Sequence, residues 1–525
     1  MSSVRLVVLL TLLAVPFAIV VQILSCNTGN DPGTQYDAVD IALSDGKGAV
    51  DRLVNLLKFR TISNSGMQES HAQDPEQFRL AHKHLHRSYS SVWKQLNVEV
   101  IAEHSLLIQW QGRNTSLQPV LFVSHIDVVP ATEGDSSEWT RPPFGGEVFD
   151  NYIYGRGAMD LKFMVIALLE AVTELLKSGW AQPERTLYLA FGHDEEVGGD
   201  RGAGAMASLL ASRGVTLDFV VDEGGPILVD GLPSLLRTPT QIALVGTAEK
   251  GFNSIIANVS GKGGHAMAPP TDHSTVPAIM SALVGSVDQH PPATHLVPPV
   301  THFMKALAPA CPNPVLRFVL SHCENRFLGY LLAKLLAKSS ANTAAVVRTT
   351  VGVTRMNAGT ADNVLPDTGA VLFNFRLLPG HSVDHPLKYL QKRLSKLLGK
   401  VKLQQAGGQK AREATPVSSP SNEQFNIVAR AIYETVQPEQ GIVVAPHLMT
   451  GASDSRHYLG ITANGVYRFF PLFLNLTAGD VSRVHGIDER IKVDDFLQAI
   501  KVYIRMIQLA CGHRNASSGT DTRQT

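Results

Sequence analysis

Residues 185–196 read "RTLYLAFGHDEE", an apolar run typical of a buried strand that is followed by three adjacent carboxylates. Two further runs have the same form, "PVLFVSHID" at 119–127 and "TLDFVVDEGG" at 216–225. Helical patterns at 160–179 and 202–214 separate the three runs. Strands that alternate with helices form doubly wound sheets, so the sequence predicts an α/β fold with a doubly wound, mixed sheet.

The polar residues that close these strands, and the one that opens the helix at 160, are expected to meet at one edge of the sheet. Ligands bind at that edge because the carboxyl ends of the strands converge there. The residues are His125, Asp127, Asp160, Glu195, Glu196 and Asp222. One imidazole with several carboxylates, and no cysteine, is a ligand set for Zn²⁺, with Mn²⁺ or Co²⁺ as substitutes.

The adjacent carboxylates after residue 193 raise an electrostatic question, because like charges repel unless a cation lies among them. Two metals roughly 3.5–4 Å apart would neutralise them and lower the pKa of a shared water. Neighbouring residues point in different directions, so one glutamate can bind metal while the other takes the water's proton. Taken singly, Asp160 is typical of a helix N-cap, His125 of a core histidine and "DEE" of a solvated loop. The metal-site hypothesis therefore depends on their joint placement.

The apolar pattern changes near Val245. Half-buried strand patterns flanking a helix predict that 246–378 forms a smaller α+β domain, set into the first as a lid or dimerisation domain. The catalytic domain would then comprise 45–245 and 379–511. The polar tail, 512–525, is predicted to be disordered.

The first 25 residues carry one basic residue, Arg5, before an apolar run from Leu6 to Leu24. This pattern predicts a secretory signal peptide, with a retained anchor as the alternative because the run is long. We therefore expect a secreted, extracellular glycoprotein. Its N-glycosylation sequons are at Asn114, Asn258, Asn475 and Asn515.

Composition excludes one class of partner and leaves one pairing open. The chain has 46 basic and 46 acidic residues and no basic block, which argues against nucleic-acid binding. Cys311 and Cys323 could form a short-loop disulfide in an oxidising compartment, but spacing alone does not settle their pairing.

An ordered series of short motifs extends over about residues 45–510. The motifs are "SHIDVVP", "YGRGAMDLK", "GHDEEVGG", "VVDEGG", "EKG", "GKGGHAMAP", "ADNVLP", "TGASDSR" and "VHGIDE". Each is weak alone, but the ordered set is specific. With it, the chain resembles the aminoacylase and carboxypeptidase S branch of the co-catalytic zinc metallopeptidases.

That resemblance implies two Zn²⁺ per chain and a role for each ligand. One zinc would bind His125 and Asp222, the other would bind Glu196 and His485, and Asp160 would bridge both. The family pattern also implies a cis peptide after Asp160.

Further roles are carried over from the same family. Glu195 would be the general base, and Asp127 would orient His125 through its second ring nitrogen. His265 would stabilise the oxyanion, often from a partner subunit, which implies a homodimer. Asn363 and Arg456 would hold the substrate's carboxylate.

The smaller domain contains an additional segment, 302–340, in which "RFLGYLLAKLLAK" is typical of an amphipathic helix. We expect this helix to pack on its own domain; the alternative is an apolar surface that admits a fatty acyl chain or contacts a lipid or lipoprotein surface.

With the signal peptide, this segment is similar to that of the family's secreted members that hydrolyse and synthesise N-fatty-acyl amino acids. The resemblance therefore implies an N-acyl amino acid as substrate, with fatty acid and amino acid as the other reactants. A carboxypeptidase or dipeptidase with the same metals is the alternative. A catalytically silent binding protein is the third reading, for which missing ligands would be expected, and none is missing.

Overall fold

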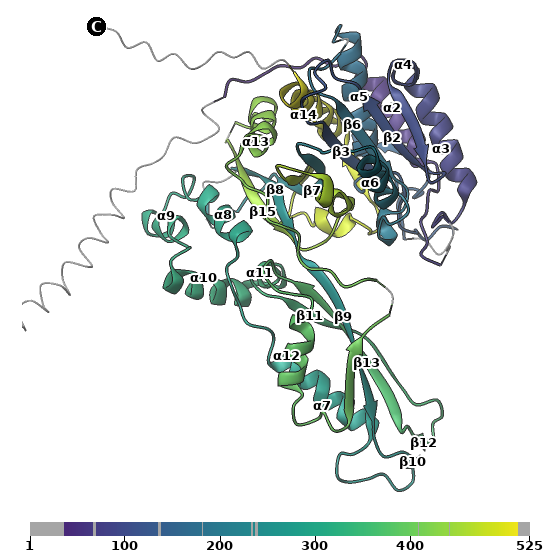
Figure 1. The fold of residues 1–525 in the computed structure, drawn as a ribbon, viewed down its shortest axis with the longest axis vertical. Helices are drawn as coiled ribbons and strands as arrows, with labels where there is room; N and C mark the ends of the chain where they lie inside the picture. The colour runs from purple at the N-terminus through teal and green to yellow at the C-terminus, as the bar shows by residue number, and fades with distance from the viewer. Residues whose placement is uncertain are drawn as a thin grey trace, which may run out of the picture. The chain divides into compact units, whose positions relative to one another are not determined.

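The computed structural model describes residues 36–512 apart from 67–69, 135–137, 181, 233–234, 237–239, 408 and 440. The predicted signal peptide, Asn515 and the tail from 513 on lie outside the described residues. The chain divides into two compact units (Figure 1). The smaller comprises Gly246–Val417 and Pro446–Ala452, and the larger comprises the described residues up to Val245, Ser418–Ala445 and those from Ser453 on.

The larger unit is built on an eight-stranded sheet. In spatial order its strands are β1 (Asn97–Ile101), β2 (Ser105–Trp110), β6 (Leu187–Gly192), β3 (Val120–His125), β7 (Val220–Leu228), β16 (Val466–Leu474), β8 (Gln241–Glu249) and β15 (Ile442–Met449). The central strands β6, β3, β7 and β16 are parallel, whereas β2 pairs with β6 and β8 pairs with β7 in antiparallel fashion. The predicted α/β fold with a mixed sheet is confirmed.

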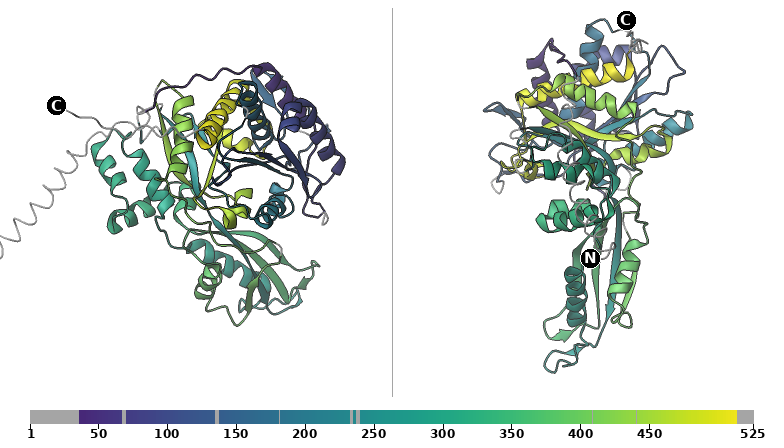
Figure 2. Two further views of the ribbon diagram at one scale, coloured as in Figure 1. Left: turned by 45° about the horizontal axis from the view of Figure 1, so that its top comes forward. Right: turned by 90° about the vertical axis from the view of Figure 1, so that its left-hand side faces the viewer.

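Helices cover both faces of this sheet (Figure 2). On one face α5 (Lys162–Lys177) packs against α14 (Val493–Cys511) and α2 (Gly46–Leu57), and on the other α6 (Ala203–Ser212) packs against β6 and the 3-10 helix η4 (Asp454–Ile461). All six residues of β3 are buried. Phe122 packs edge-on against Tyr503 of α14, while Leu121 and Val123 lie in the core beneath α6. A strand buried on both faces requires an apolar run without alternation, which is what the sequence has here.

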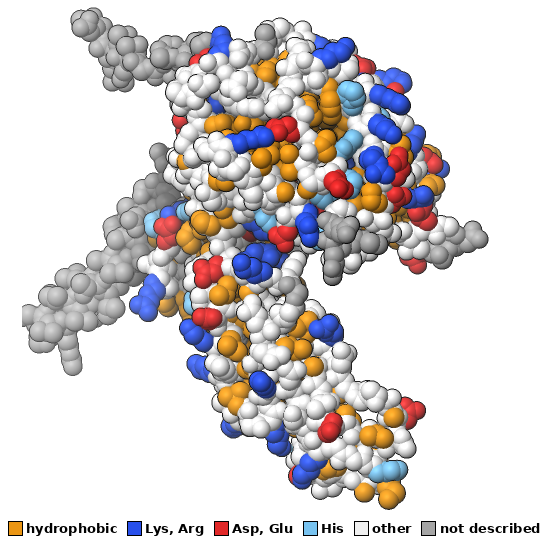
Figure 3. Space-filling model, turned by 45° about the vertical axis from the view of Figure 1, so that its right-hand side comes forward, with side chains coloured by type: hydrophobic (Ala, Val, Ile, Leu, Met, Phe, Trp, Pro, Cys, Tyr) orange, Lys and Arg blue, Asp and Glu red, His pale blue; other side chains and the backbone are white. Residues whose placement is uncertain are grey.

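The remaining elements of the larger unit surround this core. They are α3 (Pro75–Ser88), α4 (Ser90–Gln95), α13 (Glu423–Thr435), the short helices η3 (Glu195–Val197) and η5 (Asp480–Arg483), and a small sheet of β4 (Glu147–Phe149), β5 (Tyr152–Tyr154) and β17 (Arg490–Lys492). Among the described residues, no helix is both long and apolar enough to cross a membrane. On the face shown in Figure 3, basic and acidic side chains lie among one another.

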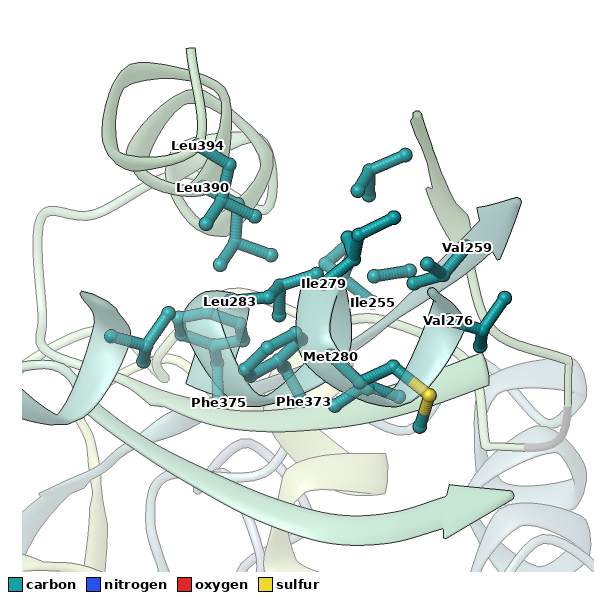
Figure 4. Packing of buried hydrophobic residues seen from close by; sticks show 14 of the residues in the cluster. Ile255, Val259, Val276, Ile279, Met280, Leu283, Phe373, Phe375, Leu390 and Leu394 are labelled. Atoms are coloured by element: carbon teal, nitrogen blue, oxygen red, sulfur yellow. The ribbon is translucent and has the colours of Figure 1, made fainter. Parts of the chain in front are cut away.

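The smaller unit contains a four-stranded antiparallel sheet, in the order β11 (Thr350–Ala358), β13 (Thr368–Leu377), β9 (Gly251–Ser260) and β14 (Val401–Gln405). Helices α7 (Val276–Gln289) and α12 (His385–Arg393) supply Leu283 and Leu390 to its core, opposite Phe373 and Phe375 of β13 (Figure 4). The unit continues beyond the predicted end at residue 378 because β14 pairs with β9 and completes the sheet.

The additional segment of the smaller unit, 302–340, lies within a helical group. The group comprises α8 (Pro298–Leu307), α9 (Pro314–Ser321), α10 (Arg326–Ser339) and α11 (Ala341–Val347). A separate pair of two-residue strands, β10 (Gly264–His265) and β12 (Val364–Leu365), is antiparallel.

Cysteines and sequons have the following places in the fold. Cys311 and Cys323 are buried and unbonded to each other; their thiols lie 3.7 Å from the Asn313 carbonyl and 3.6 Å from the Thr301 carbonyl. Three of the four sequon asparagines lie among the described residues and are half-buried, namely Asn114, Asn258 and Asn475.

Candidate metal centre

The carboxyl ends of three parallel strands and two loops of the larger unit supply the candidate ligands. His125 is the last residue of β3, Glu196 lies in η3 directly after β6, and Glu223 lies in β7. Asp160 is in the loop between β5 and α5, and His485 is in the loop between η5 and β17. The strand ends meet at one edge of the sheet, as expected for the ligand site of a doubly wound fold.

Asp160 lies between the two histidines. Its Oδ1 is 3.1 Å from Nε2 of His125, and its Oδ2 is 3.0 Å from Nε2 of His485. Nε2 of His485 is also 3.1 Å from Oε2 of Glu196, and Nε2 of His125 is 3.8 Å from Oε1 of Glu223. Two groups of potential ligands result, which share the carboxylate of Asp160.

These residues fit two Zn²⁺ ions by geometry and by donor type. Ligand atoms about 2.1 Å from a tetrahedral zinc lie roughly 3.4 Å apart, close to the separations within each group. Imidazole nitrogen and carboxylate oxygen are ordinary zinc ligands. In addition, Oε1 of Glu196 is buried and has no hydrogen-bond partner within the described part of the chain, as expected of an atom placed to meet a cation.

The electrostatics of the cluster also call for positive charge. Burial, together with the charges of Asp160 and Glu195, raises the pKa of Glu223 well above its ordinary value. Burial likewise raises the pKa of Glu196. For Asp160, burial acts to raise the pKa, but hydrogen bonds with His125 and His485 outweigh it and hold the pKa below its ordinary value. A bound cation would remove the repulsion that makes these carboxylates hard to ionise together.

Asp127 supports the ligands from behind. Its Oδ1 lies 3.3 Å from Nδ1 of His125, and its backbone oxygen lies 3.1 Å from the same nitrogen. The backbone N–H groups of Glu195 and Glu196 donate to the two oxygens of Asp127, at 3.2 and 3.1 Å, and the Ser63 hydroxyl donates at 2.6 Å. A fully buried carboxylate therefore fixes both the ring of His125 and the turn that carries the two glutamates.

Glu195 belongs to neither group of potential ligands. Burial, with further contributions from Asp454 and Glu196, raises its pKa well above the ordinary value although the charge of His125 opposes the shift. A carboxylate with a raised pKa, beside a metal group but outside it, is suited to accept a proton.

Sequence reasoning assigned the His125-side ligand to Asp222, whereas the structure places Glu223 there. Oδ2 of Asp222 accepts the backbone N–H of Ser455 at 2.6 Å, and Oδ1 accepts that of Glu223 at 2.8 Å. Successive residues of a strand point to opposite faces, so only one of this adjacent pair can face the metal group. On this geometry we propose Glu223, in place of the expected Asp222, as the His125-side ligand.

Arg456 lies in η4 of the same unit, next to the turn that carries Glu195. Its guanidinium donates to the backbone oxygens of Ser453, at 2.6 Å, and Gly198. Since the Gly198 oxygen is three residues from Glu195, this contact places the predicted carboxylate-binding arginine close to the metal group.

His265 and Asn363 belong to the smaller unit, where β10 and β12 bring them together. The backbone N–H of Ala266 donates to the backbone oxygen of Asn363 at 2.9 Å. The side chains of His265 and Asn363 are both exposed. The backbone N–H of Met267 donates to Nδ1 of His265 at 3.2 Å. The peptide bond between Asp160 and Leu161, in the larger unit, is cis, as the resemblance implied.

Comparison with known proteins supports the family resemblance. The chain is 37% identical to the N-fatty-acyl-amino acid synthase/hydrolase PM20D1 of Mus musculus, over 78% of this chain and 78% of that protein. It is 34% identical to the probable carboxypeptidase S-like 2 of Dictyostelium discoideum, over 87% of this chain and 84% of that protein. The resemblance inferred from the motifs is thus confirmed.

Solved structures share the fold. The M20 family metallo-carboxypeptidase Sso-CP2 of Sulfolobus solfataricus matches with a TM-score of 0.59 and 17% identity, covering 88% of this chain and 99% of that one. Human carnosine dipeptidase 1 matches with a TM-score of 0.57 and 16% identity, covering 89% of this chain and 96% of that one. The model of Peptidase family M20/M25/M40 matches residues 121–509. With that match and relatives of this similarity, the chain belongs to Peptidase family M20/M25/M40.

Proposed function

We propose that this metallohydrolase is a dinuclear zinc amidohydrolase that hydrolyses N-fatty-acyl amino acids and, in reverse, forms them from fatty acid and amino acid. The observation that carries the proposal is the placement of Asp160, whose two oxygens lie 3.1 and 3.0 Å from His125 and His485. One carboxylate between two ligand groups is suited to bridge two metals. The family is metal-dependent, and relatives named for this amide chemistry support the substrate.

In the proposed site each ligand residue has a defined task. His125 and Glu223 would hold one Zn²⁺, Glu196 and His485 the other, and Asp160 both. When bound, the two ions would polarise the amide carbonyl and lower the pKa of water. Asp127 would keep His125 in the tautomer that presents Nε2.

Glu195 carries the proton in this scheme. It accepts the proton that the attacking water loses, and it returns a proton to the amide nitrogen as the carbon–nitrogen bond breaks. The products are a fatty acid and a free amino acid. The reverse sequence condenses them, and reactant concentrations set the net direction.

Substrate contacts come from the family resemblance. Arg456 and Asn363 would hold the amino-acid carboxylate, and His265 would donate to the oxygen of the amide as negative charge develops on it. As in the family, His265 would act from a partner subunit, so we propose a homodimer. Sedimentation or light scattering of the purified protein tests that state.

Helix α10 supports an amphiphilic substrate and contact with lipid. The expectation that it packs on its own domain is met only in part: Ala333 is buried and Leu328, Leu332, Leu336 and Ala337 are half-buried, whereas four other apolar residues are exposed. Phe327, Tyr330, Leu331 and Leu335 are 69%, 58%, 47% and 63% exposed, and Ala333 is the buried residue of the helix. The charged residues of the helix are all basic, namely Arg326, Lys334 and Lys338. Exposed apolar residues beside basic ones fit a helix that lies on an anionic lipid surface.

A cavity of about 800 Å³ adjoins the same helix. Its apolar lining comes from Leu296, from Pro298 at the start of α8 and from Phe327, Tyr330 and Ala333 of α10, and Glu324 and Arg326 also line it. Its apolar lining suits an acyl chain. The signal-peptide pattern and the sequons support the further proposal that the protein is secreted, as a glycoprotein.

A carboxypeptidase acting next to a free carboxylate is the second candidate. The similarity to the probable carboxypeptidase S-like 2, a protein named for peptide cleavage, favours it.

The test is metal analysis of the purified protein together with hydrolysis of N-oleoyl-phenylalanine before and after chelation. About two zincs per chain and chelator-sensitive cleavage are expected. Activity that falls as the acyl group lengthens, with retained cleavage of C-terminal peptides, would contradict the lipid substrate and favour the carboxypeptidase. Absence of bound metal would overturn the dinuclear mechanism, and absence of both metal and activity would revive the silent-binding alternative.

A further inference from the structure

Glu489, four residues after the candidate ligand His485, is fully buried and points at the loop of another ligand. Its Oε1 accepts three backbone N–H groups, from Gly157 at 3.0 Å, Met159 at 2.7 Å and Asp160 at 3.0 Å. One oxygen thus holds three donors of the loop that ends in the shared carboxylate of Asp160. A loop with three of its amides fixed on one atom has little freedom to shift.

Arg156 completes the arrangement from the other side. Its Nη1 donates to Oε2 of Glu489 at 2.6 Å, and its Nη2 donates to the backbone oxygen of His485 at 3.1 Å. The arginine is 3% exposed, and its guanidinium also lies over the ring of Trp139, 5.3 Å from the ring centre. The planar guanidinium of Arg156 therefore joins Glu489 to the backbone of His485.

The two loops are also tied at their base. Strand β5 precedes the loop of Asp160, and strand β17 follows the loop of His485. These strands pair, with Arg490 opposite Tyr154. The backbone N–H of Gly155 donates to the backbone oxygen of Glu489 at 3.0 Å. From this base the side chains of Arg156 and Glu489 reach the backbones of the two ligands, at the His485 oxygen and the Asp160 N–H respectively.

We propose that Glu489 and Arg156 are positioning residues that set the separation between Asp160 and His485, and thereby zinc affinity at the shared site. This rests on the proposed dinuclear site. Neither side chain contacts the reacting atoms in this scheme; both act through the backbone of the ligands. Outer contacts of this kind typically contribute 10- to 100-fold in metal affinity or activity.

The alternative is a purely structural ion pair, and a matched control distinguishes the two. Asp218 is also a buried carboxylate: it pairs with Arg185 and accepts Gln424 at 3.0 Å and Asn464 at 2.6 Å, but it precedes β7 and touches no candidate ligand. Asp218→Asn should lower the melting temperature and leave zinc affinity unchanged. It thus reports the effect of weakening a buried ion pair alone.

The test compares Glu489→Gln, Arg156→Lys and Asp218→Asn with the full-length wild type by competition with a chromogenic zinc chelator, alongside thermal unfolding. Both oxygens of Glu489 accept hydrogen bonds, so in Glu489→Gln the side-chain NH₂ group must face a donor, either Arg156 or the backbone N–H groups of the Asp160 loop. At least one of these hydrogen bonds is therefore lost. In Arg156→Lys a single ammonium cannot reach both Glu489 and the His485 oxygen. We expect each to bind zinc at least tenfold more weakly, with turnover partly restored by added zinc.

Several results would overturn the inference. If the wild type binds two zincs and the folded Glu489 and Arg156 variants bind them within about twofold of it, the pair is structural only. Should Glu489→Gln fail to fold, Arg156→Lys alone decides between the two readings. A wild type that binds no zinc overturns the proposed function together with this inference, and so is distinguishable from failure of the inference alone.

Discussion

Asp160 and His485 come from distant parts of the chain, yet Oδ2 of the first lies 3.0 Å from Nε2 of the second. The other oxygen of Asp160 contacts His125 at 3.1 Å. Burial raises the pKa of the adjoining Glu196 and Glu223, and a cation among these carboxylates would favour their ionised forms. Metal binding should therefore stabilise the fold as well as enable catalysis.

Removal of metal is expected to lower the melting temperature of the protein. A ligand that binds only the native state stabilises it by roughly 4 kcal/mol when present at 1,000 times its dissociation constant. Thermal unfolding with and without a chelator, followed by readdition of Zn²⁺, measures the effect. Identical melting temperatures in all three samples would argue against a metal at this cluster.

Glu195→Gln should lower kcat by on the order of 10²–10⁴-fold and leave zinc content unchanged, since the amide cannot accept the proton from water. Parallel measurement of turnover and of zinc per chain checks both statements. Glu196→Gln is the matched comparison, because it should release metal from the His485 side. If Glu195→Gln loses zinc and Glu196→Gln keeps it, the two roles are reversed.

Glu223→Ala is expected to lose one zinc, whereas Asp222→Asn should keep both and destabilise the fold. The reason is that Asp222 accepts the backbone N–H groups of Ser455 and Glu223, so its oxygens serve the loop. Zinc stoichiometry with thermal unfolding separates the two effects. If Asp222→Asn loses zinc while its melting temperature is unchanged, Asp222 and not Glu223 is the ligand.

The Asp222 and Glu223 pair shows where sequence reasoning reaches its limit. Apolar runs that end in charge located the strand ends, because burial on both faces of β3 and its neighbours requires such runs. Which of two adjacent carboxylates faces the metal depends on the orientation of the strand's side chains, which composition does not reveal. Glu489 was missed for a related reason, since its three donors lie far away in the chain.

The smaller unit gives the same lesson for surfaces and boundaries. Periodicity identified α10 as an amphipathic helix, but not whether another element covers its apolar face. The predicted end at residue 378 preceded β14, whose pairing with β9 is a long-range contact. Local pattern therefore indicates the type of an element more reliably than its partners.

His447 should make stability depend on pH. Burial lowers its pKa to about 4, whereas in the unfolded chain it is about 6.5. Between these values the unfolded state binds more protons, so stability falls as the pH falls through this window. The contribution lost between pH 7 and pH 4 is on the order of 2–3 kcal/mol. The unfolding free energy of His447→Gln, measured across this range, should change less with pH than that of the wild type.

The exposed face of α10 should bind anionic vesicles. Phe327 and Leu335 are 69% and 63% exposed on a helix whose charged residues are all basic, so insertion would bury apolar area while the lysines contact the headgroups. Burying each such side chain contributes roughly 1.5–3 kcal/mol, so Phe327→Ser with Leu335→Ser should weaken binding at least tenfold. Flotation with phosphatidylcholine vesicles, with and without phosphatidylserine, measures it.

Leu398→Ser is the control for that experiment, because Leu398 is 42% exposed in the same unit but outside α10. It should bind vesicles as the wild type does. Because the lysines and arginine of α10 require anionic headgroups, vesicles without phosphatidylserine should bind less in every case. Equal binding by the double variant and the wild type would show that α10 does not contact lipid. If vesicle binding is lost while hydrolysis of monomeric N-oleoyl-phenylalanine is retained, the helix serves access to lipid-held substrate and not the chemistry.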